Sequence, residues 1–353
     1  MRSVYLDRQT VCDGSDCYVI AEIGNNHQGD FKVAKKMFRV AKNCGANAVK
    51  LQTRNNKELF TEKGYNAPYV NENSYGASYG QHREYLEFSF LEYSLLKAYA
   101  DEIGITLFST PFDYKSADFL SEWVPFFKVA SGDLRNVPFL KHIARFGKPM
   151  IVSTGGASIA DVQRAYDSIM PINSEVCLMQ CTASYPADFK VLNLRVIETY
   201  RNLFPECVIG LSSHDNGISM APVAYVLGAR VIEKHFTLNH TLKGTDHAFS
   251  LEPAGFKKMV RDLRRVKVAL GDGVKRVYSG EVEPIKKMSK CMVAATNLPV
   301  GHVLEKRDIA FKSPGDGASP HLIDGFIGGT LITSVEKDEK LTWVNVTGDS
   351  PKL

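Results

Sequence analysis

The chain has 353 residues, of which 44% are hydrophobic and 23% charged, a composition that excludes an intrinsically disordered protein. Its formal net charge of +4 is small and its basic residues are scattered, so we expect neither a nucleic-acid partner nor a membrane partner. The seven cysteines form no CxxC pair and no secretory apolar region is evident, which predicts a reduced, cytoplasmic protein.

Eight short apolar runs follow one another along the chain, and each ends in polar or ionisable residues. A strand that is buried on both faces should be apolar throughout, so a charged residue at its end is costly unless it meets a ligand or a partner. The endings are, in chain order, Glu22, Lys50 with Gln52, Ser109 with Thr110, Lys128 with Ser131, Ser153, Cys181 through Tyr185, Ser212 with His214, and Glu233 with His235. We expect these endings to share one site.

Segments of helical periodicity separate the runs. Residues 30–44 place Val33, Met37 and Val40 on one face, and Gly45 follows as a stop. Strand–helix alternation repeated in this way predicts parallel strands with right-handed crossovers, and eight repeats favour a closed α/β fold, a TIM (β/α)8 barrel, over an open sheet. No GxGxxG motif follows the first run, which weakens the dinucleotide-binding alternative. Further helices are predicted at residues 91–103, 137–146, 158–170, 194–203, 218–227 and 253–270.

The connection from residue 54 to residue 90 is unusually long and rich in Asn, Tyr and Gly. A loop of this length is usually a lid or a binding loop, and tyrosine rings and amides suit a polyhydroxylated ligand. An ordered surface excursion is the alternative.

The barrel pattern ends near residue 275, which divides the chain into three predicted parts. Residues 1–275 are the catalytic barrel, 276–290 a polar linker, and 291–353 a small β-rich domain. In this last domain we expect two short strands around the turn at Pro299 and Gly301, and two more strands within residues 331–346. Because so short a domain buries a limited core, we expect it to pack against a partner surface.

His214 and His235 end the seventh and eighth runs, which are neighbours in a barrel. Two imidazoles with water and substrate oxygens suit a divalent ion such as manganese, magnesium or zinc. For each histidine taken alone, a structural role is at least as well supported.

Lys50 and Lys128 lie near hydroxyl side chains and glycine-rich turns, a combination that binds phosphate or carboxylate groups. Internal ion pairs with Glu22 and Glu233 are the equally weighted alternative. Glu22 is also a candidate general base or sugar ligand, and Asp246 could support the site from the final loop. The hydroxyls are those of Ser131, Ser153 and Ser212.

From about Ile20 onward the chain contains, in order, the motifs AEIGNNHQGD, KLQT, SYGQHREYLEFS, STPFD, FFKVASGD, STGG, QCTASYP, GLSSHDNGI and GARVIEKHFTL. Together, and with the rest of the chain to the C-terminus, these motifs resemble those of the N-acetylneuraminate (sialic acid) synthase family, in the same order. The family joins phosphoenolpyruvate to an N-acylmannosamine-type sugar and releases phosphate, on a TIM barrel followed by an antifreeze-like (SAF) domain. The segment LPVGHVLEKRDI resembles the start of that domain.

The resemblance implies a role for each candidate residue. His214 and His235 would hold the divalent metal, for which manganese is expected first and magnesium or cobalt are alternatives. Carbon 3 of phosphoenolpyruvate would attack the open-chain aldehyde of the sugar, water would add at carbon 2, and phosphate would leave. The implied catalytic residues are Glu22, His214, His235 and Asp246, and the substrate-binding residues are Lys50, Gln52, Thr110, Lys128, Ser131, Asp133, Ser153, Tyr185, Ser212 and Glu233.

Two positions depart from the family. Many bacterial members have Asn at the position of Ala183, and a KRPG motif where this chain has Lys312-Ser313-Pro314-Gly315. In the family that arginine comes from the SAF domain of the neighbouring chain and reaches the N-acyl group, a role that Ser313 cannot fill. The resemblance thus implies a homodimer with a swapped C-terminal domain, and it leaves the amino sugar open.

Several alternatives remain at this point. The nearest is a synthase of a related nonulosonate, such as legionaminic, pseudaminic or deaminated sialic acid. A metal-dependent barrel hydrolase and a carbohydrate- or ice-binding protein explain fewer of the strand endings. The choice between a free sugar and its 6-phosphate also stays open.

Overall fold

Each of the eight apolar runs forms one strand in the computed structural model, which describes residues 2–347. These strands are parallel and pair in the order β5-β4-β3-β10-β9-β8-β7-β6, and β5 lies against β6, so that the sheet nearly closes. The predicted (β/α)8 barrel is therefore confirmed. The strands are β3 (Tyr18–Glu22), β4 (Ala48–Thr53), β5 (Thr106–Pro111), β6 (Phe127–Val129), β7 (Met150–Ser153), β8 (Val176–Cys181), β9 (Val208–Ser213) and β10 (Val231–His235).

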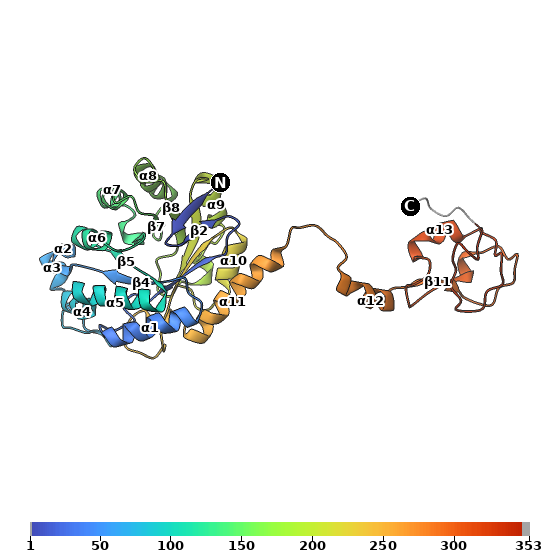
Figure 1. The fold of residues 1–353 in the computed structure, drawn as a ribbon, viewed down its shortest axis with the longest axis horizontal. Helices are drawn as coiled ribbons and strands as arrows, with labels where there is room; N and C mark the ends of the chain where they lie inside the picture. The colour runs from blue at the N-terminus through green and yellow to red at the C-terminus, as the bar shows by residue number, and fades with distance from the viewer. Residues whose placement is uncertain (1, 348–353) are drawn as a thin grey trace. The chain divides into compact units, whose positions relative to one another are not determined.

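The connecting helices surround the strands (Figure 1). In the first of them Asp30 caps the helix by accepting from the backbone N–H groups of Lys32 and Val33, and Gly45, with φ +93°, follows its end. The predicted helices are confirmed, with ends that differ from the prediction by at most two residues, and α6 is an additional helix with Asp113 as its N-terminal cap. The helices are α1 (Phe31–Asn43), α5 (Phe90–Ile103), α6 (Tyr114–Ser121), α7 (Val137–Ala144), α8 (Ile159–Ile169), α9 (Val196–Leu203), α10 (Met220–Val226) and α11 (Pro253–Leu270).

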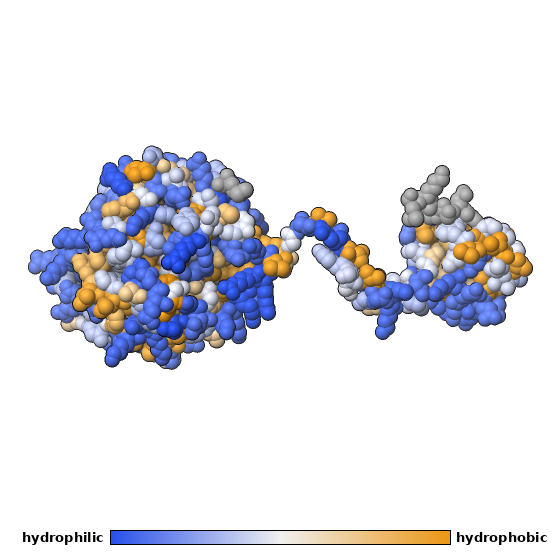
Figure 2. All heavy atoms as spheres, in the orientation of Figure 1, coloured by the Kyte–Doolittle hydropathy of each residue, from blue (hydrophilic) through white to orange (hydrophobic). Residues whose placement is uncertain are grey.

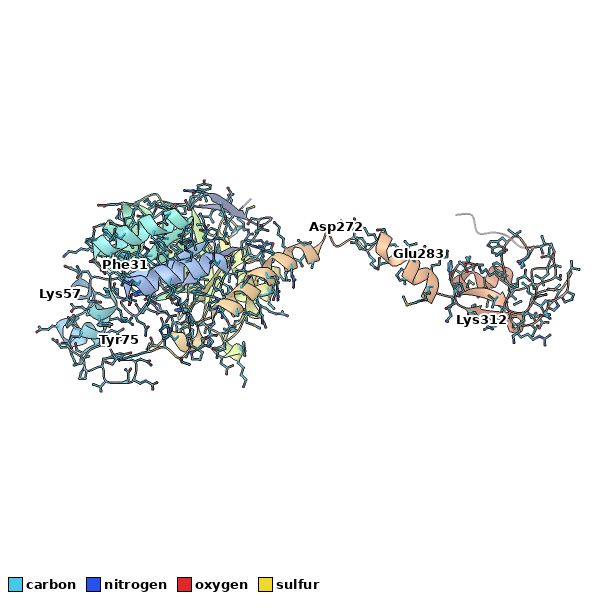
Figure 3. All side chains as sticks on the ribbon, turned by 60° about the horizontal axis from the view of Figure 1, so that its bottom comes forward. Phe31, Lys57, Tyr75, Asp272, Glu283 and Lys312 are labelled. Atoms are coloured by element: carbon cyan, nitrogen blue, oxygen red, sulfur yellow. The ribbon has the colours of Figure 1, made fainter. Side chains whose placement is uncertain are left out.

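The long connection after β4 is ordered and contains three short helices, α2 (Asn56–Leu59), α3 (Glu62–Tyr65) and α4 (Tyr79–Leu86). Aromatic contacts hold it together, since the Tyr79 ring lies 5.2 Å from the ring of Phe60 and 5.3 Å from that of Tyr69. Lys57 and Tyr75 mark this connection on the barrel in Figure 3. A hairpin of β1 (Ser3–Leu6) and β2 (Gln9–Cys12), which the sequence did not predict, precedes the barrel.

The chain divides into two units, one ending at Gly271 and the other beginning at Asp272. The second unit has its own core, in which Met292, Leu304, Phe326 and Leu331 are buried. It contains α12 (Ser279–Met288), β11 (Cys291–Ala294), β12 (Ile309–Lys312) and α13 (Ile323–Phe326), and β11 pairs with β12 in antiparallel fashion. The helix α12 lies in the stretch expected to be a linker, whose limits of 276 and 290 stay a prediction.

The two strands expected within residues 331–346 are not formed. Leu331 and Val335 make only isolated bridges, to Val346 and Leu298 respectively. The turn at Asp338, where φ is +70°, interrupts the run that the apolar residues had suggested. No helix within residues 2–347 is long and apolar enough to cross a membrane.

Candidate active site

A cavity of about 650 Å³ opens at the carboxyl ends of the barrel strands, where TIM barrels place their active sites. Its lining includes every residue to which the resemblance gave a catalytic or substrate-binding role, except Asp133. These residues are Glu22, Lys50, Gln52, Thr110, Lys128, Ser131, Ser153, Tyr185, Ser212, His214, Glu233, His235 and Asp246. The structure thus brings the predicted strand endings together.

Asp133 and Ser109 are among the expected residues that do not line the cavity. Asp133 sits in a single turn of 3-10 helix, where its carboxylate accepts a hydrogen bond from the Asn136 amide at 3.2 Å. Ser109 is fully buried and shares a hydrogen bond of 2.7 Å with Thr53, whereas its neighbour Thr110 faces the cavity. Successive residues of a strand point to opposite faces, so only one of each such pair can reach the site.

Lys50, Lys128, Glu22 and Glu233 form one buried network of charges. The Lys50 ammonium lies 2.7 Å from Glu22 Oε2 and 3.8 Å from Glu233 Oε1. The Lys128 ammonium lies 3.9 Å from Glu233 Oε1. The ion pairs expected as the alternative interpretation are therefore present, and both lysines line the cavity as well.

Hydroxyl groups complete this network. Lys50 donates to Thr110 Oγ1 at 3.0 Å, and Lys128 donates to Ser153 Oγ at 2.6 Å. The Ser212 hydroxyl donates to Glu233 Oε1 at 3.2 Å. Because the hydroxyls can rotate, they can also donate to an anion that enters the cavity.

The two glutamates differ in their readiness to take up a proton. Burial raises the pKa of Glu22, although the charge of Lys50 opposes this effect. Burial also acts on Glu233, but Lys128 and Lys50 outweigh it and hold the pKa of that carboxyl below its ordinary value. Glu22 is thus the better candidate for proton transfer near neutral pH.

Glu22, Gln52 and Asp246 converge around Gly24. The Gln52 amide donates to Glu22 Oε1 at 2.8 Å. A Cβ at Gly24, where φ is +51°, would lie 3.1 Å from both the Gln52 amide nitrogen and Glu22 Oε1, and 3.6 Å from Asp246 Oδ2. Glycine is therefore favoured here, because a larger residue would be strained at this φ and would crowd Gln52 and Glu22.

A similar close approach occurs on the opposite side of the cavity. The backbone N–H of Gly155 donates to Ser131 Oγ at 2.9 Å. A Cβ at Gly155 would lie 2.8 Å from that oxygen and 3.1 Å from the Cβ of Ala183. The glycine after β7 thus fixes the Ser131 hydroxyl beside the small side chain of Ala183.

His214 and His235 lie side by side, with 5.3 Å between their ring centres. His214 Nδ1 is 2.8 Å from the carbonyl oxygen of Thr182, which can only accept, so this nitrogen carries the proton and Nε2 keeps its lone pair. His235 Nδ1 is buried, has no hydrogen-bond partner among the residues that the structure describes, and lies 3.8 Å from Asp246 Oδ2.

The protonation state of the two imidazoles suits a cation. Burial lowers the pKa of both His214 and His235 to about 4, so both rings are neutral near pH 7 and can donate a lone pair. Within residues 2–347, no group of three or more His, Cys, Asp and Glu side chains is arranged to hold a metal. The pair, with its orphaned His235 nitrogen, fits an ion that takes its remaining ligands from water and substrate.

Three arginines of the lining were not predicted from the sequence: Arg54, Arg83 and Arg135. Arg54 directly follows β4, so its position after a strand was an available signal. Arg83 lies in the motif SYGQHREYLEFS, in which no residue had been given a role. Cys181 also lines the cavity, and burial raises the pKa of its thiol.

The chain resembles characterised synthases along most of its length. The model of the NeuB family matches residues 37–275, and that of the SAF domain matches residues 290–347. The N-acetylneuraminate-9-phosphate synthase of Homo sapiens is 40% identical, over 92% of this chain and 91% of its own length. The N,N'-diacetyllegionaminic acid synthase of Campylobacter jejuni is 34% identical, over 91% of this chain and 97% of its own.

A solved structure supports the same relationship. The N-acetylneuraminic acid synthetase of Leptospira borgpetersenii, crystallised in complex with citrate, superposes with a TM-score of 0.71 at 32% identity. The match covers 80% of this chain and 95% of that one.

Proposed function

Because the chain belongs to the NeuB family of sialic acid synthases, which are phosphoenolpyruvate-dependent condensing enzymes, we propose that it joins phosphoenolpyruvate to N-acetylmannosamine or its 6-phosphate. The product is N-acetylneuraminate or its 9-phosphate, and inorganic phosphate is released. The observation that carries this proposal is the cavity in which two buried lysines, two glutamates and two neutral histidines meet.

Phosphoenolpyruvate is the anion for which the lysines are suited. Its carboxylate and phosphate would accept charge-assisted hydrogen bonds from Lys50 and Lys128, which already lie in the cavity. Because each ammonium has three N–H donors, both lysines can keep a glutamate partner and still donate to the substrate. The hydroxyls of Ser131, Ser153 and Ser212 and the side chains of Gln52 and Thr110 line the same space.

His214 and His235 are the residues that would hold a divalent ion, and we propose manganese, with magnesium or cobalt as alternatives. When bound, such an ion supplies Lewis-acid polarisation of the sugar aldehyde. The Thr182 carbonyl fixes the His214 ring, and Phe249 packs against the His235 ring at 4.9 Å between centres. These contacts hold the two imidazoles in place.

Glu22 is the proposed proton acceptor for the water that adds at carbon 2 of phosphoenolpyruvate. Its pKa, raised by burial, is closer to neutral pH than that of an exposed glutamate, and Lys50 at 2.7 Å stabilises the carboxylate form. Asp246 and Tyr185 line the side of the cavity where we place the sugar.

A related nonulosonate synthase is the second candidate. The legionaminic acid synthases among the relatives support it, and so does Ser313, which replaces an arginine directed at the N-acyl group in related enzymes. All seven cysteines are free thiols, in keeping with the cytoplasmic location that we propose.

The test is a substrate panel with phosphoenolpyruvate and a divalent metal, read out as phosphate release and product mass. The panel contains N-acetylmannosamine, its 6-phosphate, mannose 6-phosphate and the diacetylated sugar precursor of legionaminic acid. We expect phosphate release with N-acetylmannosamine or its 6-phosphate. Release without any sugar would indicate a hydrolase, and turnover of the diacetylated sugar alone would favour the second candidate.

A further inference from the structure

Arg83 stands out among the cations of the cavity because none of the carboxylates within residues 2–347 pairs with it. Lys50 and Lys128 are matched by Glu22 and Glu233. We propose that Arg83 binds a phosphate group at the end of the sugar remote from its aldehyde, so that the acceptor is a 6-phosphosugar. This inference rests on the proposed function and assigns its sugar specificity to one residue.

The other two arginines of the lining are already paired. Arg54 Nη1 lies 3.2 Å from Glu87 Oε1, and Arg135 Nη2 lies 3.0 Å from Asp161 Oδ2. Within residues 2–347, no carboxylate oxygen lies within 4.0 Å of the Arg83 guanidinium. Glu87, the acidic neighbour on the same side, also accepts a hydrogen bond from the backbone N–H of Arg54 at 3.0 Å, so both of its carboxylate oxygens are bound to Arg54.

The guanidinium of Arg83 is held in place by a neutral group. Its Nε and Nη2 donate to the Tyr79 hydroxyl at 3.1 and 2.9 Å, and the guanidinium carbon, Cζ, lies 5.1 Å from the centre of the Tyr79 ring. Tyr79 is in turn packed between Phe60 and Tyr69. The remaining N–H groups of Arg83 are thus free to form the forked hydrogen bonds that recognise phosphate.

More positive charge gathers on this side of the cavity. Burial, followed by the charges of Arg83, Lys243 and Arg54, lowers the pKa of the neighbouring His82 to about 4. Lys243 lies 4.7 Å from the centre of the Tyr75 ring, which belongs to the same connection as Arg83. The cations therefore produce a field that favours a doubly charged group here.

The carbon chain of the sugar is consistent with a phosphate group near Arg83 and an aldehyde near the two histidines. Phosphoenolpyruvate contributes its own carbons to the start of the product, so carbon 6 of the sugar becomes carbon 9. The aldehyde at carbon 1 must approach the two histidines at the ends of β9 and β10, which directs carbon 6 away from them. Arg83 belongs to α4 in the connection after β4, and it lines the same cavity.

The experiment compares kcat/KM for N-acetylmannosamine 6-phosphate and N-acetylmannosamine in the full-length enzyme and in Arg83→Ala and Arg83→Lys. We expect the wild type to prefer the phosphosugar. In Arg83→Ala this preference should fall about 30-fold or more, mostly through the KM of the phosphosugar, since a charge-assisted contact is lost. Arg83→Lys, which keeps the charge but not the fork, should retain part of the preference.

Arg39→Ala is the matched control, because Arg39 also donates to a tyrosine hydroxyl, that of Tyr99 at 3.1 Å, but does not line the cavity. It should leave the preference unchanged, and the thermal unfolding midpoints of the variants check that each one folds. Equal efficiency on both sugars in the wild type, or an unchanged preference in a folded Arg83→Ala, would overturn the assignment of Arg83 while leaving the synthase function intact. Absence of turnover with every sugar of the panel would overturn both.

Discussion

Glu22 and Lys50 face each other on the adjacent strands β3 and β4 and form an ion pair of 2.7 Å, although their side chains are only 2% and 4% exposed. Removing two charges from water is costly, and well-packed apolar residues are often as stabilising as a buried pair. We therefore propose that this pair serves catalysis, with the ammonium near the proposed phosphoenolpyruvate site and the carboxylate in a position to accept a proton.

Lys50→Ala should raise the KM for phosphoenolpyruvate and lower kcat, because it removes a contact with a multiply charged substrate. It should also lower the free energy of unfolding by about 3 kcal/mol, since Glu22 is left buried without its partner. Steady-state kinetics and urea unfolding measure the two effects. Lys57→Ala, at an exposed lysine, is the control, and wild-type kinetics in Lys50→Ala would assign that lysine a purely structural role.

His214→Ala and His235→Ala should each abolish metal-dependent turnover and reduce the metal bound after dialysis, while the barrel stays folded. Residues at the carboxyl ends of barrel strands contribute more to chemistry than to stability. Elemental analysis of bound metal, with activity in chelator and after metal is restored, measures this. Full activity in chelator would contradict the assignment of these histidines.

The barrel was predictable because each of its strands is buried on both faces and so appears as an apolar run with a polar end. The helices α2 to α4 were not, because residues 54–90 lack a regular apolar repeat and are held by contacts between aromatic rings such as Tyr69 and Tyr79. Asp133 was expected in the site from its motif alone, but the turn after β6 directs it to Asn136 instead.

The roles of the arginines in the cavity could not be predicted from the sequence either. Whether an arginine is free to bind a ligand depends on which carboxylates lie near it, and that is a property of the tertiary structure. Arg54 and Arg83 both belong to the connection after β4, yet only Arg54 meets Glu87 at ion-pair distance. No periodicity or spacing in the sequence distinguishes the two.

His27 should make the fold sensitive to acid. Burial, with a smaller contribution from Arg54, lowers the pKa of this histidine to about 3, while an unfolded histidine titrates near 6.5. The contribution of neutral His27 to the free energy of unfolding is complete above about pH 6.5. It is lost as the pH falls toward the pKa of the folded state, and the loss reaches about 2 kcal/mol by about pH 5. Urea unfolding at several pH values measures the loss.

His27→Gln should flatten this part of the pH profile, whereas His321→Gln, at an exposed position, should not. A pH dependence that is unchanged in a folded His27→Gln would show that other groups cause it. The ring of His27 also stacks on Phe88 at 4.3 Å, so some loss of stability at all pH values is expected as well.

The C-terminal unit should be required for activity and for assembly. Helix α12 exposes Val282, Ile285 and Met288, and Figure 2 shows apolar atoms along its surface. We predict that a second copy of the chain covers them in a homodimer with swapped C-terminal domains. Deleting residues from Cys291 onward should abolish turnover and weaken dimerisation in light scattering, whereas a monomeric, fully active full-length protein would contradict this arrangement.

The central claim is that phosphoenolpyruvate condenses with a sugar while water adds at carbon 2 and phosphate leaves. If the oxygen that bridges carbon 2 and phosphorus is labelled with oxygen-18, the bond between carbon 2 and this oxygen breaks, so the label leaves with the phosphate. The measurement is the phosphorus NMR shift of the released phosphate, together with the mass of the product. We predict labelled phosphate in equal amount to a product extended by three carbons; unlabelled phosphate, or labelled phosphate with pyruvate as the only organic product, would contradict the account.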